Sequence, residues 1–231
     1  MIEEPPLLTI ARDRRRPDAA QIAAFQSVPT SFVVDAMYGT GALSNRIRPL
    51  GESRDLVSVA AGPALTVGCG AGDILALLAA LDTVQAGDIV LAAFDGFQGC
   101  AAMGDRVSGM LRNAGAAGFV TDGPVRDYAG IVGIGMPCWA TGLTPASPYA
   151  NGPGSVGLPI QIGGRQVETG DMIVADHDGV VVVPYARIDA VIAKLETVKE
   201  LEIALDAEVA NGLTIPPSMV EMLRGDKVRY V

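Results

Sequence analysis

The residues best suited to chemistry lie in one stretch, GDRVSGMLRNAGAAGFVTDGPVRDY, at positions 104–128. Asp105 falls in the first turn of a predicted helix, and twenty residues separate it from Arg126, which Asp127 follows directly. Arg126 and Asp127 come after a predicted strand and a Gly-Pro turn. The helix and strand can therefore return them to the end at which Asp105 lies, where ligand sites form in α/β sheets.

These residue types suit the stabilisation of an enolate. The Asp127 carboxylate can hold a hard cation that polarises a 2-oxo group, and the Arg126 guanidinium can stabilise negative charge on that oxygen. Free N–H groups near Arg106 and Val107 can bind a substrate carboxylate at the helix start, and Asp105 can order a water or relay a proton. Spacing alone leaves open a surface salt bridge of Arg126, which contributes little energy.

The available ligand types favour Mg²⁺ or Mn²⁺ as the cation. His177 is the only histidine, and its context ADHDGV predicts an exposed turn. Cys69, Cys100 and Cys138 are too far apart for a zinc motif or a disulfide framework, so we expect reduced thiols. A metal would then have oxygen ligands, which suit magnesium or manganese.

Composition argues against several other functions. The net charge is −9, and the only basic cluster, Arg12 with residues 14–16, is interrupted by Asp13, which predicts a solvated segment and no nucleic-acid binding. The run GCGAG at 68–72 has Asp73 where a dinucleotide fingerprint needs its third glycine. No signal peptide or membrane segment is recognisable, which predicts a cytoplasmic protein.

The elements that must position the charged residues are predicted as a single α/β domain over 1–231. An irregular N-terminal segment covers 1–17 and a long helix covers 185–210. The remaining predicted elements are helices from Asp18 and Ser31, two strands joined by a Gly-Pro turn within 56–70, a helix at 73–81, strands at 86–94, 117–123 and 136–142, a helix at 101–113, and hairpins within 159–184.

Three features together resemble the RraA-like family: the D-x20-R-D spacing, the lead-in GAAGFVTDGPVRD and the later GDMIVADHDGVVVVP. The resemblance runs from about Ser31 to about Gly212. The family includes regulators of ribonuclease activity A and class II pyruvate aldolases that act on 4-hydroxy-4-methyl-2-oxoglutarate. Some members carry the label demethylmenaquinone methyltransferase, but this chain has no recognisable glycine-rich cofactor loop. The resemblance implies a swivelling β/β/α architecture and a homotrimer or hexamer with active sites between subunits.

The resemblance also implies roles for individual residues. Asp127 resembles the metal-anchoring aspartate, Arg126 the residue that faces the 2-oxo oxygen, and Asp105 the acid linked to metal-bound water. The amides of Arg106 and Val107 resemble those that hold the pyruvate carboxylate.

An acidic residue from a neighbour's C-terminal helix completes the site in the aldolases, and Glu202 is the best match, with Glu200 next. The alternative for both is the solvated face of a helix.

These observations predict a divalent-metal-dependent lyase that cleaves a small 2-oxo acid through a pyruvate enolate, as an aldolase or an oxaloacetate decarboxylase. The alternative is a non-catalytic regulator that binds a protein such as ribonuclease E. One departure bears on the substrate, because the aldolase pattern R-D-x2-E/D here ends in Gly130. We therefore expect oxaloacetate decarboxylation to exceed aldol cleavage, and Gly130→Glu to raise the aldolase rate.

Overall fold

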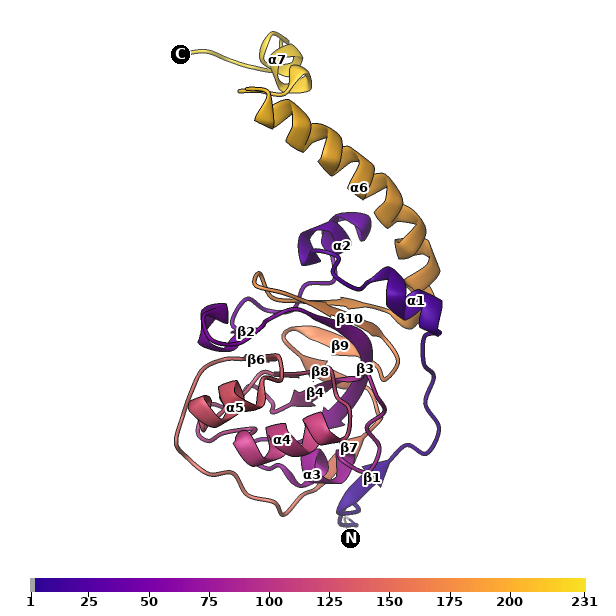
Figure 1. Cartoon of the computed structure of the whole chain (residues 1–231), viewed down its shortest axis with the longest axis vertical. Coiled ribbons are helices and arrows are strands. Elements are labelled where there is room, and N and C mark those ends of the chain that lie inside the picture. Colours follow the sequence, from indigo (N-terminus) through magenta and orange to yellow (C-terminus); the bar gives the residue numbers. More distant parts are fainter. Residues whose placement is uncertain (1–2) are drawn as a thin grey trace.

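The sheet is built around β4 (Ile89–Ala93), whose five apolar residues are all buried. The computed structural model describes residues 3–231 (Figure 1). β4 lies between the parallel strands β3 (Ala60–Gly68) and β5 (Gly118–Thr121), and β6 (Cys138–Ala140) continues the parallel order beyond β5. Continuous apolar runs of this kind are typical of parallel strands covered on both faces. The predicted α/β fold is confirmed.

Short strands extend the sheet on both sides. β2 (Arg48–Pro49) pairs antiparallel with β6, and β7 (Gly154–Val156) pairs antiparallel with the end of β3. β1 (Leu8–Ile10) pairs parallel with β7. The prediction that 1–17 is irregular is therefore wrong at residues 8–10, where backbone pairing with a distant strand outweighs a proline-rich local sequence.

β3 is one continuous strand of nine residues that changes partner along its length. Its first half pairs antiparallel with β10 (Met172–Ala175), and its second half pairs parallel with β4. The predicted Gly-Pro turn is wrong, because Pro63 lies inside the strand where the partner changes. A Cβ at Gly62 would collide with the carbonyl of Gly87, so glycine permits the close approach of these two backbone segments.

Three short helices cover one face of the parallel strands (Figure 1): α3 (Leu75–Ala80), α4 (Asp105–Asn113) and α5 (Tyr128–Ile134). Helix α5 was not predicted, because its seven residues include Gly130 and Gly133 and three β-branched side chains, a composition of low helix propensity. On the opposite face, the buried Trp139 packs with the hairpin of β8 (Ile160–Ile162) and β9 (Arg165–Val167).

A second helical layer covers β10 and its antiparallel partner β11 (Val180–Val183). It contains α1 (Ala19–Ala24), α2 (Thr30–Ala36) and the first part of α6 (Ile188–Ala210). The predicted cap Asp18 is confirmed, since it forms a capping box with Gln21. The predicted exposure of His177, in the turn between β10 and β11, is also confirmed.

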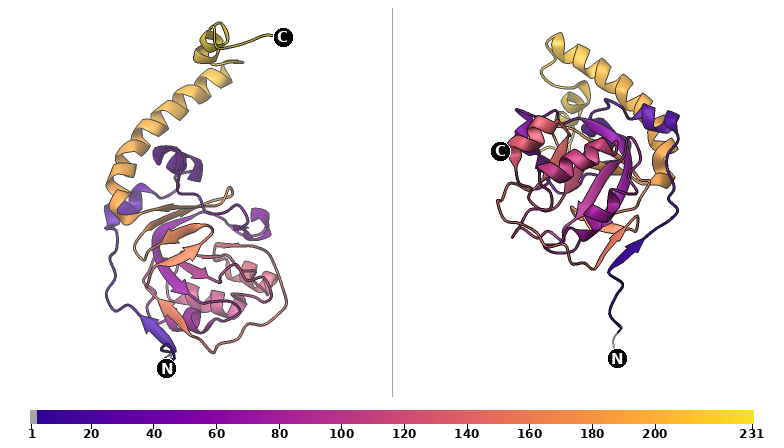
Figure 2. Two further views of the ribbon diagram at one scale, coloured as in Figure 1. Left: turned by 180° about the vertical axis from the view of Figure 1, so that it is seen from behind. Right: turned by 60° about the horizontal axis from the view of Figure 1, so that its bottom comes forward.

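Helix α6 continues beyond the body as an arm (Figures 1 and 2). Its buried positions Ile188, Val191, Leu195 and Val198 follow helical spacing and stop there. The apolar residues beyond them are exposed, namely Leu201, Ile203, Leu205 and Val209. Helix α7 (Pro217–Leu223), which was not predicted, lies at the end of the arm. No helix within residues 3–231 is long and apolar enough to cross a membrane.

A buried carboxylate ties the N-terminal segment to the sheet. Asp88 is fully buried at the start of β4, where it accepts hydrogen bonds from Arg14 Nη2 at 2.7 Å and from the backbone N–H of Gln85 at 2.8 Å. Arg16 forms an ion pair with the same carboxylate. The prediction of a solvated basic cluster is thus wrong for Arg14 and Arg16, whose side chains are largely buried.

We expect Asp88→Asn to lower the free energy of unfolding by about 3 kcal/mol, because two largely buried guanidinium groups lose their counter-charge. Urea denaturation measures the change. Glu52→Gln is the control: Glu52 makes a 3.9 Å ion pair with Arg54 at an exposed site, and its loss should cost less than about 0.5 kcal/mol. Equal effects of the two substitutions would contradict this role for Asp88.

Candidate active site

The three charged residues singled out from the sequence do line one pocket. It has a volume of about 460 Å³, and its walls include Asp105, Arg126 and Asp127 together with Met103 and Pro148. The pocket lies beyond the carboxyl ends of β4 and β5, where ligand sites form in parallel sheets.

Two segments far apart in the sequence are held side by side here. Ala102 N–H donates to the Pro124 carbonyl at 2.7 Å, and Arg126 N–H donates to the Met103 carbonyl at 2.9 Å. These bonds place Gly104 against Arg126 and Asp127. Backbone hydrogen bonds, rather than side chains, thus hold the segment of Arg126 and Asp127 next to the segment that leads into Asp105.

Gly104 leaves room for the two charged groups. A Cβ on this residue would lie 2.6 Å from Asp127 Oδ2 and 3.1 Å from Arg126 Nε. Arg126 Nε and Asp127 Oδ2 are themselves 3.3 Å apart. The pocket thus has a guanidinium and a carboxylate side by side, with a glycine backbone as the adjoining wall. Sequence reasoning did not single out Gly104, although its place immediately before the helix start was a signal for it.

The backbone at Asp127 is left-handed, with φ 61° and ψ 46°. It is the residue before α5, but its side chain makes no capping hydrogen bond. Asp is one of the few non-glycine residues that adopt this conformation, at a cost of about 1 kcal/mol. The strained backbone turns the carboxylate away from the helix it precedes and leaves it available to a ligand.

Arg126 is oriented by a residue that the sequence did not indicate. Arg126 Nη1 donates to Ser147 Oγ at 2.6 Å. Ser147 belongs to the loop 143–153, which Asp73 fixes by accepting the N–H groups of Asn151 and Gly152 at 2.6 and 3.1 Å. Nothing in the local sequence connects residue 147 to Arg126, so only the tertiary structure identifies this contact.

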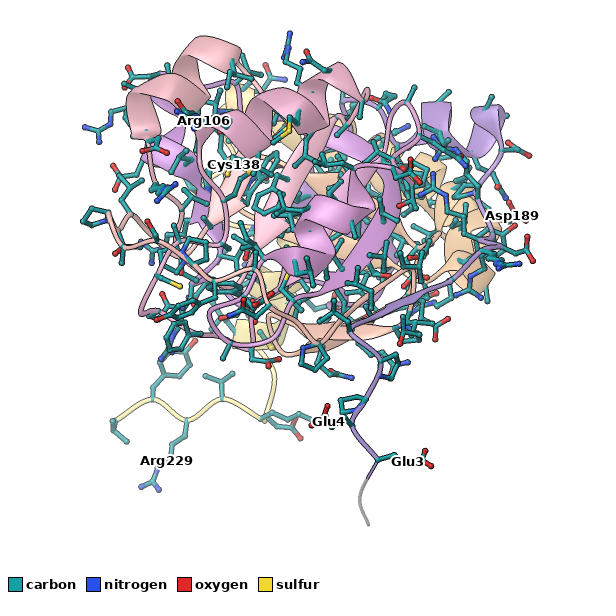
Figure 3. All side chains as sticks on the ribbon, turned by 90° about the horizontal axis from the view of Figure 1, so that it is seen from below. Glu3, Glu4, Arg106, Cys138, Asp189 and Arg229 are labelled. Carbon is teal, nitrogen blue, oxygen red and sulfur yellow. The ribbon has the colours of Figure 1, made fainter. Side chains whose placement is uncertain are left out.

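Of the two amides expected to be free at the start of α4, one already has a hydrogen-bond partner. Arg106 N–H donates to Asp105 Oδ1 at 2.7 Å, so the prediction that this amide is free is wrong. The short Asp105 side chain folds back over its own helix terminus and satisfies that donor. Val107 N–H makes no hydrogen bond within residues 3–231, in keeping with the prediction, and Val107 lines the pocket. The Arg106 side chain is exposed at the same helix start (Figure 3).

Gly130 lies directly against Asp105. A Cβ at residue 130 would be 2.6 Å from both Cβ and Oδ2 of Asp105. The backbone of Gly130 is helical, so a positive φ is not the obstacle. A glutamate here would displace Asp105 or separate α5 from α4, and we therefore no longer expect Gly130→Glu to raise an aldolase rate.

Glu202 and Glu200 are not among the residues that line this pocket. Both lie on the arm, on α6 beyond its last buried residue Val198. The structure of a single chain therefore does not bring these acids to the pocket, and their predicted role in a neighbouring site stays a prediction.

The cysteines do not supply reactive thiolates. All three thiols are free and buried. Burial raises the pKa of Cys69 and of Cys138 to about 12, and it also raises the pKa of Cys100. Cys138 lies on the buried strand β6 (Figure 3). Because a thiolate is the reactive form, these residues are poor nucleophiles at neutral pH.

The donor set fits a hard divalent cation. Within residues 3–231, no three His, Cys, Asp or Glu side chains gather into a cluster that could hold a metal. The pocket has two carboxylates, Asp127 and Asp105. Magnesium is commonly bound through one or two carboxylates and retains water in its other positions, whereas zinc takes three or four protein ligands. Mg²⁺ or Mn²⁺ therefore fits these residues better than zinc.

We expect Gly104→Ala to weaken Mn²⁺ binding at least ~10-fold, because the new methyl group displaces the Asp127 carboxylate. Isothermal titration calorimetry measures the dissociation constant. Gly109→Ala, in the same helix, is the control, since its Cβ would make only an ordinary 3.5 Å contact with Ile134. Unchanged Mn²⁺ affinity in the Gly104 variant would show that this carboxylate does not hold the ion.

Comparisons with known proteins identify the family of this chain. The profile of the RraA-like family (Aldolase/RraA) matches residues 30–182. A protein of Halalkalibacterium halodurans named "Putative 4-hydroxy-4-methyl-2-oxoglutarate aldolase" is 37% identical over 173 residues, which cover 75% of this chain and 80% of that protein.

Two solved structures are also similar. Streptomyces coelicolor RraAS2, described as an unusual member of the RNase ES inhibitor RraA protein family, superposes with a TM-score of 0.71 at 28% identity, covering 84% of this chain and all of that one. The RNA-processing inhibitor RraA of Thermus thermophilis gives a TM-score of 0.61 at 25% identity, covering 69% of this chain and 94% of that one. With the match of the family profile over residues 30–182, these likenesses show that the chain belongs to the RraA-like family.

Proposed function

We propose that this protein is a divalent-metal-dependent lyase that cleaves a carbon–carbon bond of a small 2-oxo acid through a pyruvate enolate. The observation that carries the proposal is the pairing of Arg126 with the left-handed Asp127 in a pocket that also contains the free Val107 amide. The relative named as a 4-hydroxy-4-methyl-2-oxoglutarate aldolase supports the same reaction class.

Each residue of the pocket has a distinct task in this proposal. Asp127 would hold Mg²⁺ or Mn²⁺, which when bound supplies Lewis acidity toward the 2-oxo group. Arg126, oriented by Ser147, donates hydrogen bonds to the 2-oxo oxygen as it gains negative charge. The Val107 N–H at the start of α4 binds the substrate carboxylate. Asp105 exchanges a proton with the enolate carbon through a water.

The absence of a side chain at Gly130 bears on the choice of substrate. Aldol cleavage requires a group that accepts the proton of the 4-hydroxyl, and residue 130 provides none. Decarboxylation of oxaloacetate has no hydroxyl to deprotonate. We therefore propose that oxaloacetate decarboxylation is faster than cleavage of 4-hydroxy-4-methyl-2-oxoglutarate.

The test of the proposed function is pyruvate release from oxaloacetate, measured with Mg²⁺, with Mn²⁺ and after exhaustive chelation. We expect chelation to abolish the enzymatic rate and either ion to restore it. Arg126→Lys should lower kcat at least ~10²-fold, because an ammonium group keeps the charge but lacks the planar fork. Arg112→Lys, which lies on the outer part of α4 and bonds the Gly135 carbonyl, is the control. Full turnover without metal would overturn the proposal.

We further propose that the protein is a homotrimer, or a hexamer of two trimers, in which the arm of one subunit reaches the pocket of the next. The exposed apolar residues of the arm support this, since Leu201, Ile203 and Val209 remain more than half exposed among residues 3–231. The part of α6 beyond Val198 is about 18 Å long. Glu202, or else Glu200, would then be the acid supplied to a neighbouring site.

Co-expression of Glu202→Gln with Arg126→Lys tests the shared site. Each variant alone should be nearly inactive, whereas each mixed trimer should regain about one of its three sites, or roughly a quarter of all sites after random mixing in equal amounts, because that pocket combines an intact Arg126 with a neighbour's intact Glu202. The control pairs Arg126→Lys with the double variant Arg126→Lys/Glu202→Gln and should regain none. A fully active monomer in light scattering would exclude this arrangement.

A second candidate function is that of a regulator that binds a protein such as ribonuclease E, as the similarity to RNase ES inhibitor structures suggests. A binding surface has no need of a cation beside an arginine in a pocket, so the joint presence of Asp105, Arg126 and Asp127 favours catalysis. The same oxaloacetate assay discriminates the two, because a regulator would release no more pyruvate than the metal ion releases without protein.

A further inference from the structure

A second hollow, with a volume of about 660 Å³, is larger than the catalytic pocket and shares no lining residue with it. One wall comes from the carboxyl ends of three adjacent parallel strands: Gly96 follows β4, Asp122 follows β5 and Thr141 follows β6. The carboxyl edge of a parallel sheet is where α/β proteins bind ligands. The size is within the usual range of small-molecule sites.

The polar groups on this wall form a connected network. Asp122 accepts the N–H of Phe94 at 2.6 Å and that of Gly96 at 2.9 Å, one on each carboxylate oxygen. Gln98 Nε2 donates to the carbonyls of Gly96 and Asp122, and the Thr141 hydroxyl donates to Gln98 Oε1 at 2.7 Å. The wall is therefore rigid, and lone pairs of Asp122 and Thr141 remain to accept a ligand hydroxyl.

Two arginines add positive charge to the lining of this hollow. Arg46 and Arg48 line the hollow, and within residues 3–231 neither forms an ion pair, in contrast to Arg14, Arg15 and Arg16. Arg48 is held in place, because it lies on β2 opposite Ala140 and its Nε donates to the Asn45 carbonyl at 3.0 Å. In a chain of net charge −9, two arginines that line one hollow and form no ion pair within residues 3–231 are a binding feature for an anion.

We propose that this hollow binds a small hydroxylated di- or tricarboxylate, with Arg46 and Arg48 on its carboxylates and the Asp122–Thr141 wall on its hydroxyl. The planar guanidinium fork matches a carboxylate bidentately. The hydroxyl requirement follows from the acceptor oxygens of Asp122 and Thr141, which line the same hollow as the arginines. This site is separate from the proposed catalytic pocket, and the proposal does not depend on the reaction carried out there.

Titration calorimetry of the full chain at constant ionic strength, with citrate, malate and succinate as probes, tests the proposal. We expect malate to bind about fivefold to tenfold more tightly than succinate, which lacks only the hydroxyl. Arg46→Gln and Arg48→Gln should each weaken citrate binding at least about tenfold. Arg54→Gln is the matched control, because Arg54 is close in sequence and exposed but does not line the hollow.

Three results would overturn the proposal. One is the absence of citrate and malate binding to the wild-type chain at millimolar concentration. Another is binding that survives both arginine substitutions but is lost in Arg126→Lys, which would place the anion in the catalytic pocket. The third is a change of oligomeric state in Arg46→Gln or Arg48→Gln, which would show that these arginines bind the acidic arm of a second copy.

Discussion

The parallel pairing of β3, β4 and β5 is the constraint on which both pockets depend. β4 is hydrogen-bonded to a parallel strand on each side and is buried throughout. A shift of its register would therefore move every side chain of β4 to the other face of the sheet and disrupt the core. All segments that leave the carboxyl ends of these strands consequently emerge at one edge. They divide there: the first residues after β4, β5 and β6 form one wall of the larger hollow, and residues further along line the proposed active-site pocket.

The chemistry of the smaller pocket depends on close backbone approach more than on long side chains. Two backbone hydrogen bonds and the missing side chain of Gly104 bring a guanidinium and a carboxylate to 3.3 Å from one another. Ser147, from a distant loop, then orients the guanidinium. Both charged side chains remain partly exposed, so their mutual attraction is weak in water.

Sequence reasoning succeeded where the signal was periodic or local. The apolar run of β4, the cap at Asp18, the existence of the long helix α6 and the meeting of Asp105 with Arg126 and Asp127 were all predictable. It failed where tertiary pairing decides the outcome, as at β1, at the proline inside β3 and at the glycine-rich α5. The hydrogen bond that occupies the Arg106 amide is local, since it comes from the adjacent Asp105. The contact of Ser147 with Arg126 and the clash that a side chain at residue 130 would make with Asp105, in contrast, depend on atoms brought together from separate segments. No local pattern encodes them.

The left-handed backbone at Asp127 affects how a protein of this fold can change its role over evolutionary time. Most residues resist this conformation, but asparagine and glycine adopt it readily. Each is one nucleotide substitution away from some aspartate codon. Either replacement removes the carboxylate while leaving the turn, the start of α5 and the neighbouring Arg126 in place. A lineage can therefore lose this proposed cation ligand in one step with almost no penalty in folding. The protein keeps the rest of its surface intact, and selection can then act on that surface for binding to a partner.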